Sequence, residues 1–159
     1  MEKGRAHIVT WAEVHRDVRD LVRKLMPLGP WKGIVALTRG GLVPAAIVAR
    51  EMNIRLLDTL CIASYEDQDR SDVAVLKTPE QAVADDGEGW LLIDDLVDTG
   101  ATLRAARGLL KKAHFATVYA KTDGAAVVDT YCHAVDQDAW VYFPWDLDVR
   151  PVQPMVDGG

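Results

Sequence analysis

The chain opens with an amphipathic pattern that is typical of a helix. Thr10 is a favourable N-cap residue, and Glu13 three positions later completes a capping box. Apolar residues then recur every three or four positions, at Val14, Val18, Leu21, Val22 and Leu25. This spacing predicts a helix over 11–26, and the segment 27–30, which contains two prolines and a glycine, ends it.

Short apolar runs alternate with helical segments along most of the remaining chain. The runs predict buried strands at 33–37, 56–63, 90–93 and 115–120. Helical spacing predicts helices at 42–52 and 102–112. This alternation is typical of an α/β fold, in which helices cover both faces of a central, mainly parallel sheet. Ligands bind such sheets beyond the carboxyl ends of the strands.

Length and charge narrow the choice of function. At about 150 residues per domain, a chain of 159 residues predicts a single domain over 1–159. Lys and Arg total 18 against 24 Asp and Glu, so the net charge is −6. Duplex nucleic acid is therefore a poor default partner, because binding its backbone needs a basic surface. A phosphorylated small molecule needs only a local positive site or a metal ion.

The cysteines and the N-terminal residues favour a reducing, cytoplasmic location. Cys61 and Cys132 form no CxxC pair, which disfavours a zinc site or a redox motif. The N-terminus lacks the apolar stretch of a signal peptide. No apolar run approaches the roughly 18 residues that a membrane span requires, so we expect none.

One polar stretch interrupts the alternation. Residues 64–77 are rich in charged side chains, with a short strand-like piece at 73–76. A polar segment of this length inside a compact domain is more often a mobile functional loop than filler. We therefore expect a flexible loop over 64–77 that serves a ligand site.

The segment from Leu91 to Thr102 carries the clearest chemistry. An apolar strand ends in Asp94 and Asp95, and a loop of small and hydroxyl-bearing residues leads into a helix. Free backbone N–H groups at a helix start attract phosphate, and Gly100 allows close approach. The two carboxylates suit sugar hydroxyls or a divalent cation.

Three other interpretations of this segment are weaker. A P-loop nucleotidase also ends a strand in acidic residues, but GxxxxGK[ST] is absent from the sequence. A receiver domain shares the acidic pair but does not call for the Asp98-Thr99-Gly100 run that follows here. A purely structural loop with helix caps is the third alternative.

Residues 94–102 resemble the phosphoribosyl-diphosphate motif of the type I phosphoribosyltransferases. The segments 8–11, 31–34, 39–44 and 144–146 resemble the bacterial xanthine-guanine subgroup of that family. The resemblance covers nearly the whole chain. It implies a phosphoribosyltransferase fold with a small hood formed by the C-terminal segment and a flexible loop over 64–77.

The resemblance also implies a role for each residue around phosphoribosyl diphosphate. Asp94 would meet the ribose hydroxyls, and Asp95 would hold Mg²⁺, partly through water. Arg39 and Gly40 match the loop that grips pyrophosphate, often through a non-proline cis peptide. The 5′-phosphate would be held by Asp98, Thr99, Gly100, Ala101 and Thr102. In the flexible loop the family's arginine position falls at Ser71, and Arg70 one residue earlier would bind pyrophosphate after a one-residue shift.

For the base, the resemblance implies a 6-oxopurine: guanine, xanthine or hypoxanthine. Asp98 would exchange a proton with purine N7. Lys121 would donate to the 6-oxo group, Trp140 would stack on the ring, and the Val141 carbonyl would accept from a 2-amino group. The resemblance further implies Mg²⁺ as cofactor and a dimer or tetramer, and it allows weak peripheral association with the inner face of the cell membrane.

Two other functions remain open at this stage. One is a regulator of the same fold that senses phosphoribosyl diphosphate and binds nucleic acid, or a scaffold without activity. The net charge of −6 and the lack of a Lys/Arg cluster disfavour the nucleic-acid regulator. The other is a phosphoribosyltransferase for adenine or orotate, which Lys121 together with Trp140 disfavours.

Overall fold

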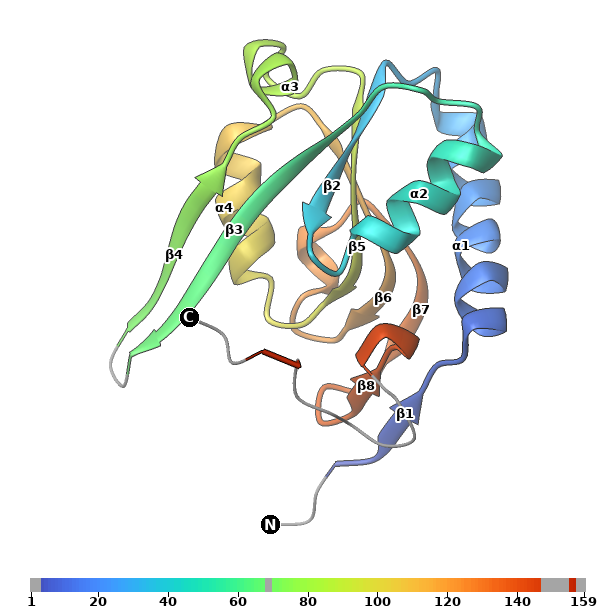
Figure 1. Cartoon of the computed structure of the whole chain (residues 1–159), viewed down its shortest axis with the longest axis vertical. Helices are drawn as coiled ribbons and strands as arrows, with labels where there is room; N and C mark the ends of the chain where they lie inside the picture. Colours follow the sequence, from blue (N-terminus) through green and yellow to red (C-terminus); the bar gives the residue numbers. More distant parts are fainter. Residues whose placement is uncertain (1–3, 68–69, 147–154, 157–159) are drawn as a thin grey trace.

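A six-stranded sheet forms the centre of the structure (Figure 1). The computed structural model describes residues 4–67, 70–146 and 155–156, and for 65–67 and 70–71 it describes the backbone alone. From edge to edge the strands are β4 (Arg70–Lys77), β3 (Leu57–Asp67), β2 (Gly33–Thr38), β5 (Trp90–Val97), β6 (His114–Lys121) and β7 (Thr130–Val135). Only β4 runs antiparallel to its neighbour within this sheet. The predicted mainly parallel α/β sheet is confirmed.

Helices cover both faces of the sheet and divide the core in two. Helices α1 (Trp11–Leu25) and α2 (Leu42–Glu51) lie on one face, and α4 (Ala101–Leu109) lies on the other (Figure 1). The short α3 (Glu80–Ala84) buries Ala82 in the second core. Alternate residues of β5 enter the two cores: Leu91 and Ile93 pack with α1 and α2, and Leu92 packs with α4. Because both sides of the strand are buried there, its first four residues, Trp90–Ile93, are all apolar.

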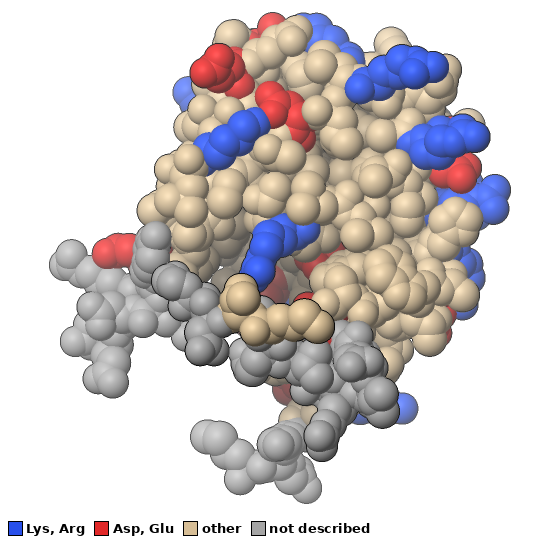
Figure 2. Space-filling view, viewed as in Figure 1, with Lys and Arg blue, Asp and Glu red and all other residues tan. Residues whose placement is uncertain are grey.

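The helix predicted near the N-terminus is confirmed almost to the residue. Helix α1 begins at Trp11, and Thr10 and Glu13 form the predicted reciprocal capping box. Its buried side includes every apolar position that the spacing identified. No helix within the described part of the chain is both long and apolar enough to cross a membrane. On the face shown in Figure 2, basic side chains are spread over α1 and α2 with acidic ones among them.

A second, smaller sheet joins the two ends of the chain. Strand β1 (Ala6–Ile8) pairs in parallel with β8 (Trp140–Tyr142), and the 3-10 turn η3 (Pro144–Asp146) follows β8. The backbone N–H of Val9 donates to the Tyr142 carbonyl at 2.9 Å, which extends the pairing. This small sheet lies beyond the carboxyl ends of the central strands (Figure 1). It thus occupies the position expected of a hood.

Three of the predicted elements have a different form or end in the structure. Where a loop was expected over 64–77, β3 and β4 form a long antiparallel ribbon that pairs as far as Asp67 and Arg70. Strand β5 continues to Val97 instead of ending at Ile93, because Asp94, Leu96 and Val97 keep pairing with β6. Helix α4 ends at Leu109 instead of Lys112, since the Lys112 N–H donates to the Asp86 carbonyl at 2.8 Å and not to the helix.

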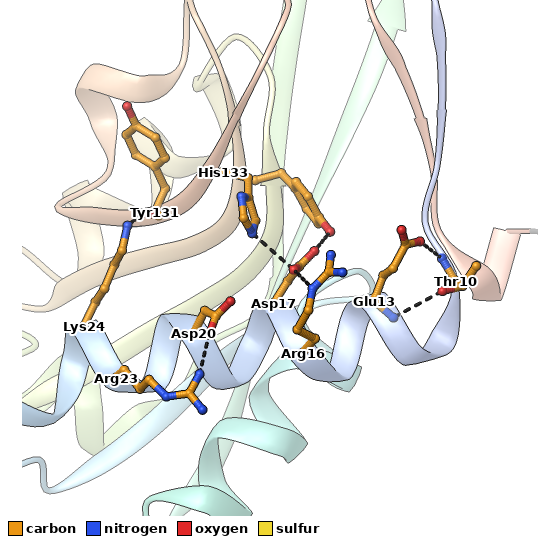
Figure 3. Close-up of polar contacts among 10 residues, drawn as sticks. Thr10, Glu13, Arg16, Asp17, Asp20, Arg23, Lys24, Tyr131 and His133 are labelled. Atoms are coloured by element: carbon orange, nitrogen blue, oxygen red, sulfur yellow. Dashed lines mark hydrogen bonds and ion pairs between the residues drawn. The ribbon is translucent and has the colours of Figure 1, made fainter.

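A buried carboxylate fastens α1 to the sheet (Figure 3). The Asp17 side chain, only 3% exposed, accepts hydrogen bonds from the Arg16 Nε at 2.9 Å and from the Tyr119 hydroxyl of β6. The His133 Nε2 of β7 lies 3.1 Å from its Oδ1. Burial by itself would raise the pKa of Asp17, but these hydrogen bonds and the nearby His133 together lower it.

We predict that Asp17→Asn lowers the free energy of unfolding by about 1–3 kcal/mol, because the buried hydroxyl of Tyr119 loses a charged acceptor. Urea denaturation at pH 7 measures the change. Asp20→Asn, one turn along the same helix, is the matched control. The Asp20 side chain is 41% exposed and pairs with Arg23, so its loss should cost less than about 1 kcal/mol. Equal losses in the two variants would contradict the assignment.

The same contact predicts a pH dependence. The folded-state pKa of Asp17 lies below its ordinary value of 3.8. The stabilisation is therefore fully present above pH 3.8 and is lost as the pH falls through the folded-state value. The stability difference between the wild type and Asp17→Asn should narrow in that acidic range, and a difference that grows there would be inconsistent with a charged Asp17.

Candidate functional site

An open cavity of about 1220 Å³ lies at the carboxyl ends of β2 and β5. From β2 the chain crosses to β3 on one side, whereas from β5 it crosses to β6 on the other. The two connections leave a crevice between them, the place where sheets of this kind bind ligands. Segment 38–40 after β2 and segment 98–103 after β5 line this crevice. The sequence-predicted residues of both segments are thus brought together.

Asp94 and Asp95 lie on the cavity wall within β5, not in a loop. One oxygen of each is fixed locally: Asp94 Oδ1 accepts from the Asp95 N–H at 2.9 Å, and Asp95 Oδ1 accepts from the Leu96 N–H at 2.7 Å. Burial and the adjacent carboxylate raise the pKa of Asp94 well above its ordinary value. Burial, together with the charge of Asp146, raises the pKa of Asp95 to about 6. A cation or hydroxyl donors would relieve this repulsion.

The charge around the cavity also favours a cation. Four carboxylates face it, those of Asp94, Asp95, Asp98 and Asp146. Among its described lining residues the basic side chain is that of Arg39, which is exposed. In the space-filling view acidic side chains lie inside the hollow and a basic side chain lies beside it (Figure 2). Carboxylate oxygens are the ligands that Mg²⁺ prefers in proteins.

The turn after β2 packs directly against the acidic pair. A Cβ atom at Gly40 would lie 2.4 Å from Asp95 Oδ2, so only glycine fits there. The peptide bond between Thr38 and Arg39 is cis, as the resemblance implied for this turn. Arg39 and Gly40 of this turn line the cavity together with the two carboxylates.

The start of α4 is open toward the cavity. Its N-cap residue, Gly100, has φ +90° and offers no side chain to bond the first N–H groups of the helix. Helix α1, in contrast, is closed by Thr10 and Glu13. Thr99, Ala101 and Thr102 line the cavity around this end. Uncapped N–H groups at the positive end of a helix dipole form a site for phosphate.

Asp98 is tied to two other parts of the site. Its Oδ2 lies 3.2 Å from the Nζ of Lys121, at the end of β6, and its Oδ1 accepts from the Gln137 Nε2 at 2.8 Å. Lys121 is buried, with a side chain 9% exposed, whereas the Asp98 side chain is 55% exposed. Lys121 does not itself line the cavity but reaches it through Asp98.

The residues predicted to hold a base lie at the edge of this arrangement. Trp140 and Val141 are on β8, outside the set that lines the cavity. The Trp140 ring is 65% exposed and lies 6.2 Å from that of Tyr142. Val141 is buried in the core with α1 and α2. Their predicted contacts with a base stay predictions.

Sequence reasoning missed several cavity residues. Trp145, whose ring stacks on Phe143 at 4.8 Å, lines the cavity together with Asp146. Both belong to the segment 144–146 that carried part of the resemblance, but nothing in the pattern assigned them a position. Gln137 was missed as well, because its contacts depend on the folding of three separate loops.

The predicted loop arginine cannot be placed. The Arg70 backbone belongs to β4, but the side chains of Arg70 and Ser71 lie outside the described ones, so the choice between them stays a prediction. The described ribbon residue Ser64 does line the cavity. The ribbon thus approaches the site, as the expected functional loop should.

A second group of ligand-type side chains lies away from the cavity. Ligand atoms of Asp20, Cys132 and His133 fall within 4.8 Å of one another. Asp20 already pairs with Arg23, and His133 with Asp17. Burial raises the pKa of the Cys132 thiol, which disfavours the thiolate that a metal needs. The carboxylates of the cavity are the better metal ligands.

The sequence matches the model of the phosphoribosyl transferase domain over residues 6–151. A xanthine-guanine phosphoribosyltransferase of Chromohalobacter salexigens is 54% identical over 149 residues, which cover 94% of this chain and 89% of that protein. A protein of the same name from Desulfotalea psychrophila is 48% identical and covers 96% of this chain and 93% of its own length.

Solved structures share the fold at much lower identity. The xanthine-guanine-hypoxanthine phosphoribosyltransferase of Helicobacter pylori superposes with a TM-score of 0.76 at 20% identity, covering 91% of this chain and 96% of that one. A purine phosphoribosyltransferase of Pyrococcus horikoshii gives a TM-score of 0.75 at 23% identity, covering 96% and 99%. The predicted fold class is confirmed by these likenesses and by the family model.

The geometry of the α4 start predicts opposite effects of the same substitution at two glycines. Gly100→Ala would force a side chain into the left-handed region and place its Cβ 2.7 Å from Val127 Cγ2. We expect the free energy of unfolding to fall by about 1–3 kcal/mol. Gly108→Ala, in the same helix, has nothing within 4 Å of the added Cβ and should stabilise by about 0.5–1 kcal/mol. Denaturant unfolding compares the two, and a stable Gly100→Ala would refute the assigned backbone.

Proposed function

This chain belongs to the phosphoribosyltransferase family, and on that premise we propose that it is a Mg²⁺-dependent 6-oxopurine phosphoribosyltransferase. The reaction moves the 5-phosphoribosyl group of phosphoribosyl diphosphate to N9 of guanine, xanthine or hypoxanthine. The products are GMP, XMP or IMP and pyrophosphate, as purine salvage requires.

One observation carries the proposal: an acidic pair and an uncapped helix start face the same crevice. Phosphoribosyl diphosphate needs both, because it combines a sugar with two hydroxyls, a 5′-phosphate and a metal-binding diphosphate. The 48–54% identity to named xanthine-guanine enzymes over nearly the whole chain supports the choice of base.

Different residues around the crevice would bind different parts of the substrate. Asp94 would accept from the ribose hydroxyls, and the segment 98–102 would receive the 5′-phosphate on backbone N–H and hydroxyl groups. Arg39 and Gly40 would bind pyrophosphate, with Arg70 of the ribbon as a further contact. Each of these positions except Arg70 borders the cavity, which supports the assignment.

A magnesium ion fits the donor set. Asp95 would hold it, partly through water, because burial and the nearby Asp146 charge raise the pKa of this carboxyl, so a cation would stabilise its ionised form. When bound, the ion would neutralise charge on the pyrophosphate leaving group. The protein supplies Arg39 and the N-terminus of α4 for the same purpose.

The base would be held at the Lys121 side of the crevice. The Lys121 ammonium would donate to the 6-oxo group, and a 6-amino group, itself a donor, would be rejected. Trp140 is exposed enough to stack on a ring, and the Val141 carbonyl would accept from a 2-amino group. The 3.2 Å contact between Lys121 and Asp98 supports the proposal that the two side chains bind neighbouring atoms of one base.

In the proposed reaction, purine N9 forms a bond to the anomeric carbon as the bond from that carbon to pyrophosphate breaks. Asp98 takes the proton from N7 that the base must lose. Positive charge develops on the sugar and negative charge on the leaving oxygens, and the fixed donors of the crevice stabilise the latter. Closure of the β3–β4 ribbon would exclude water and suppress hydrolysis.

We propose further that the protein acts in the cytoplasm as a homo-oligomer, a dimer or tetramer, without a nucleic-acid partner. The net charge of −6 and cysteines that form no motif support the cytoplasmic location and the lack of a nucleic-acid partner, whereas the oligomer rests on the family resemblance. Weak association with the inner face of the cell membrane is a property that the family resemblance adds. Sedimentation of the purified protein would determine the oligomer.

The direct test mixes the protein, Mg²⁺ and phosphoribosyl diphosphate with each purine and follows nucleotide formation. We expect turnover of oxopurines and little with adenine. Asp98→Asn should lower kcat by roughly 10²–10⁴-fold while nucleotide binding remains, since general acid–base groups contribute about that much. Asp86→Asn, in a turn that precedes β5 at the opposite edge of the sheet, is the control. Full activity of Asp98→Asn would remove Asp98 from its assigned role.

Choice of base is tested at Lys121. Lys121→Ala should lower kcat/KM for guanine by roughly 10²–10³-fold, the usual cost of one well-placed donor, and narrow the gap between guanine and adenine. Lys112→Ala provides the comparison, because this lysine is exposed and its ion pair is with exposed Glu88. An unchanged preference in Lys121→Ala would show that another group selects the 6-oxo substituent.

A further inference from the structure

Gln137 joins three loops at the edge of the site. It lies in the turn between β7 and β8, and its Oε1 accepts from the Asp123 N–H, after β6, at 2.9 Å. Its Nε2 donates to Asp98 Oδ1, after β5, at 2.8 Å. Together the two hydrogen bonds fix which way round the side-chain amide of Gln137 lies. A backbone N–H needs an oxygen acceptor, so the amide nitrogen must face the carboxylate.

Asp98 needs such a partner because of where it lies. It is in the loop between β5 and α4, and with a side chain 55% exposed it has room to rotate. A group that exchanges a proton works only when it is held in line with the reacting atom. Gln137 and Lys121 each fix one oxygen of the carboxylate.

The two donors are not equivalent during the proposed reaction. Lys121 is assigned to the 6-oxo group of the base, so its hold on Asp98 weakens when the base enters. Gln137 has no assigned contact with substrate, and its far end is fixed by Asp123. It is the described side chain that can keep Asp98 oriented throughout.

We propose that Gln137 is a positioning residue that orients Asp98 toward purine N7 and links this carboxylate to the turn leading into the base-stacking strand β8. The proposal rests on the proposed function. Gln137 does not take the proton, which goes from N7 to Asp98. It holds Asp98, the proton acceptor. Because Trp140, which would stack on the base, follows three positions later, Gln137 also sets the distance between Asp98 and the base.

The test replaces Gln137 in two ways. Gln137→Met keeps the length but removes the donor, and it should lower kcat roughly tenfold to a hundredfold, the cost of losing a group that orients a functional residue. KM for phosphoribosyl diphosphate should stay within about twofold. Gln137→Glu is nearly isosteric and should be worse, because it sets a carboxylate against Asp98. Gln81→Met, on the exposed side of α3, is the matched control.

A double-mutant cycle separates positioning from a structural role. In an Asp98→Asn background, Gln137→Met should cost less than about twofold further, because the group it orients no longer accepts a proton. A full additional loss there, or an unchanged kcat in either single variant, overturns the proposal. Far-UV circular dichroism checks folding, and Gln137→Glu alone carries the test if Gln137→Met fails to fold. A wild type without oxopurine transfer would instead refute the proposed function itself.

Discussion

The reversal of strand order between β2 and β5 is the constraint on which the rest of the structure depends. Because the connections from these adjacent parallel strands lead away in opposite directions, no helix of the described residues covers the space at their carboxyl ends. The turn at Arg39 and Gly40 and the start of α4 therefore face each other across one crevice. A ligand that spans the crevice can be held from both sides by backbone groups.

The electrostatics of this crevice follow from the same geometry. Strand β5 is buried on both faces, so extending it to Val97 carries Asp94 and Asp95 to a place where water solvates them poorly. Their ionised forms are costly until a cation or hydroxyl donors arrive. The uncapped α4 start holds the complementary positive potential close by. An acidic protein thereby gains a site that suits the proposed anionic sugar diphosphate and Mg²⁺ without a cluster of lysines.

The features that were predicted correctly from the sequence depend on interactions between residues close together in the chain. The capping box and apolar spacing identified α1, and the Asp94 to Thr102 segment identified the crevice, because caps, glycines and strand ends act over a few residues. The end of β5 was predicted too early. The apolar run stops at the two carboxylates, but the strand itself continues because its backbone keeps pairing with β6. The β3–β4 ribbon was missed because it projects past the core, and a strand that buries little has no reason to be apolar.

Gln137 could not be assigned from the sequence for a different reason: its partners Asp98 and Asp123 come from separate segments that only the fold brings together. Gln137 meets Asp98 because β5, β6 and β7 are neighbours whose carboxyl ends share one edge. The hydrogen bond ties the small β1–β8 sheet to the crevice, since the turn that carries Gln137 runs directly into β8. Movement of that sheet against the core would therefore alter the orientation of Asp98. Parts that are separate in sequence thus act on a single carboxylate.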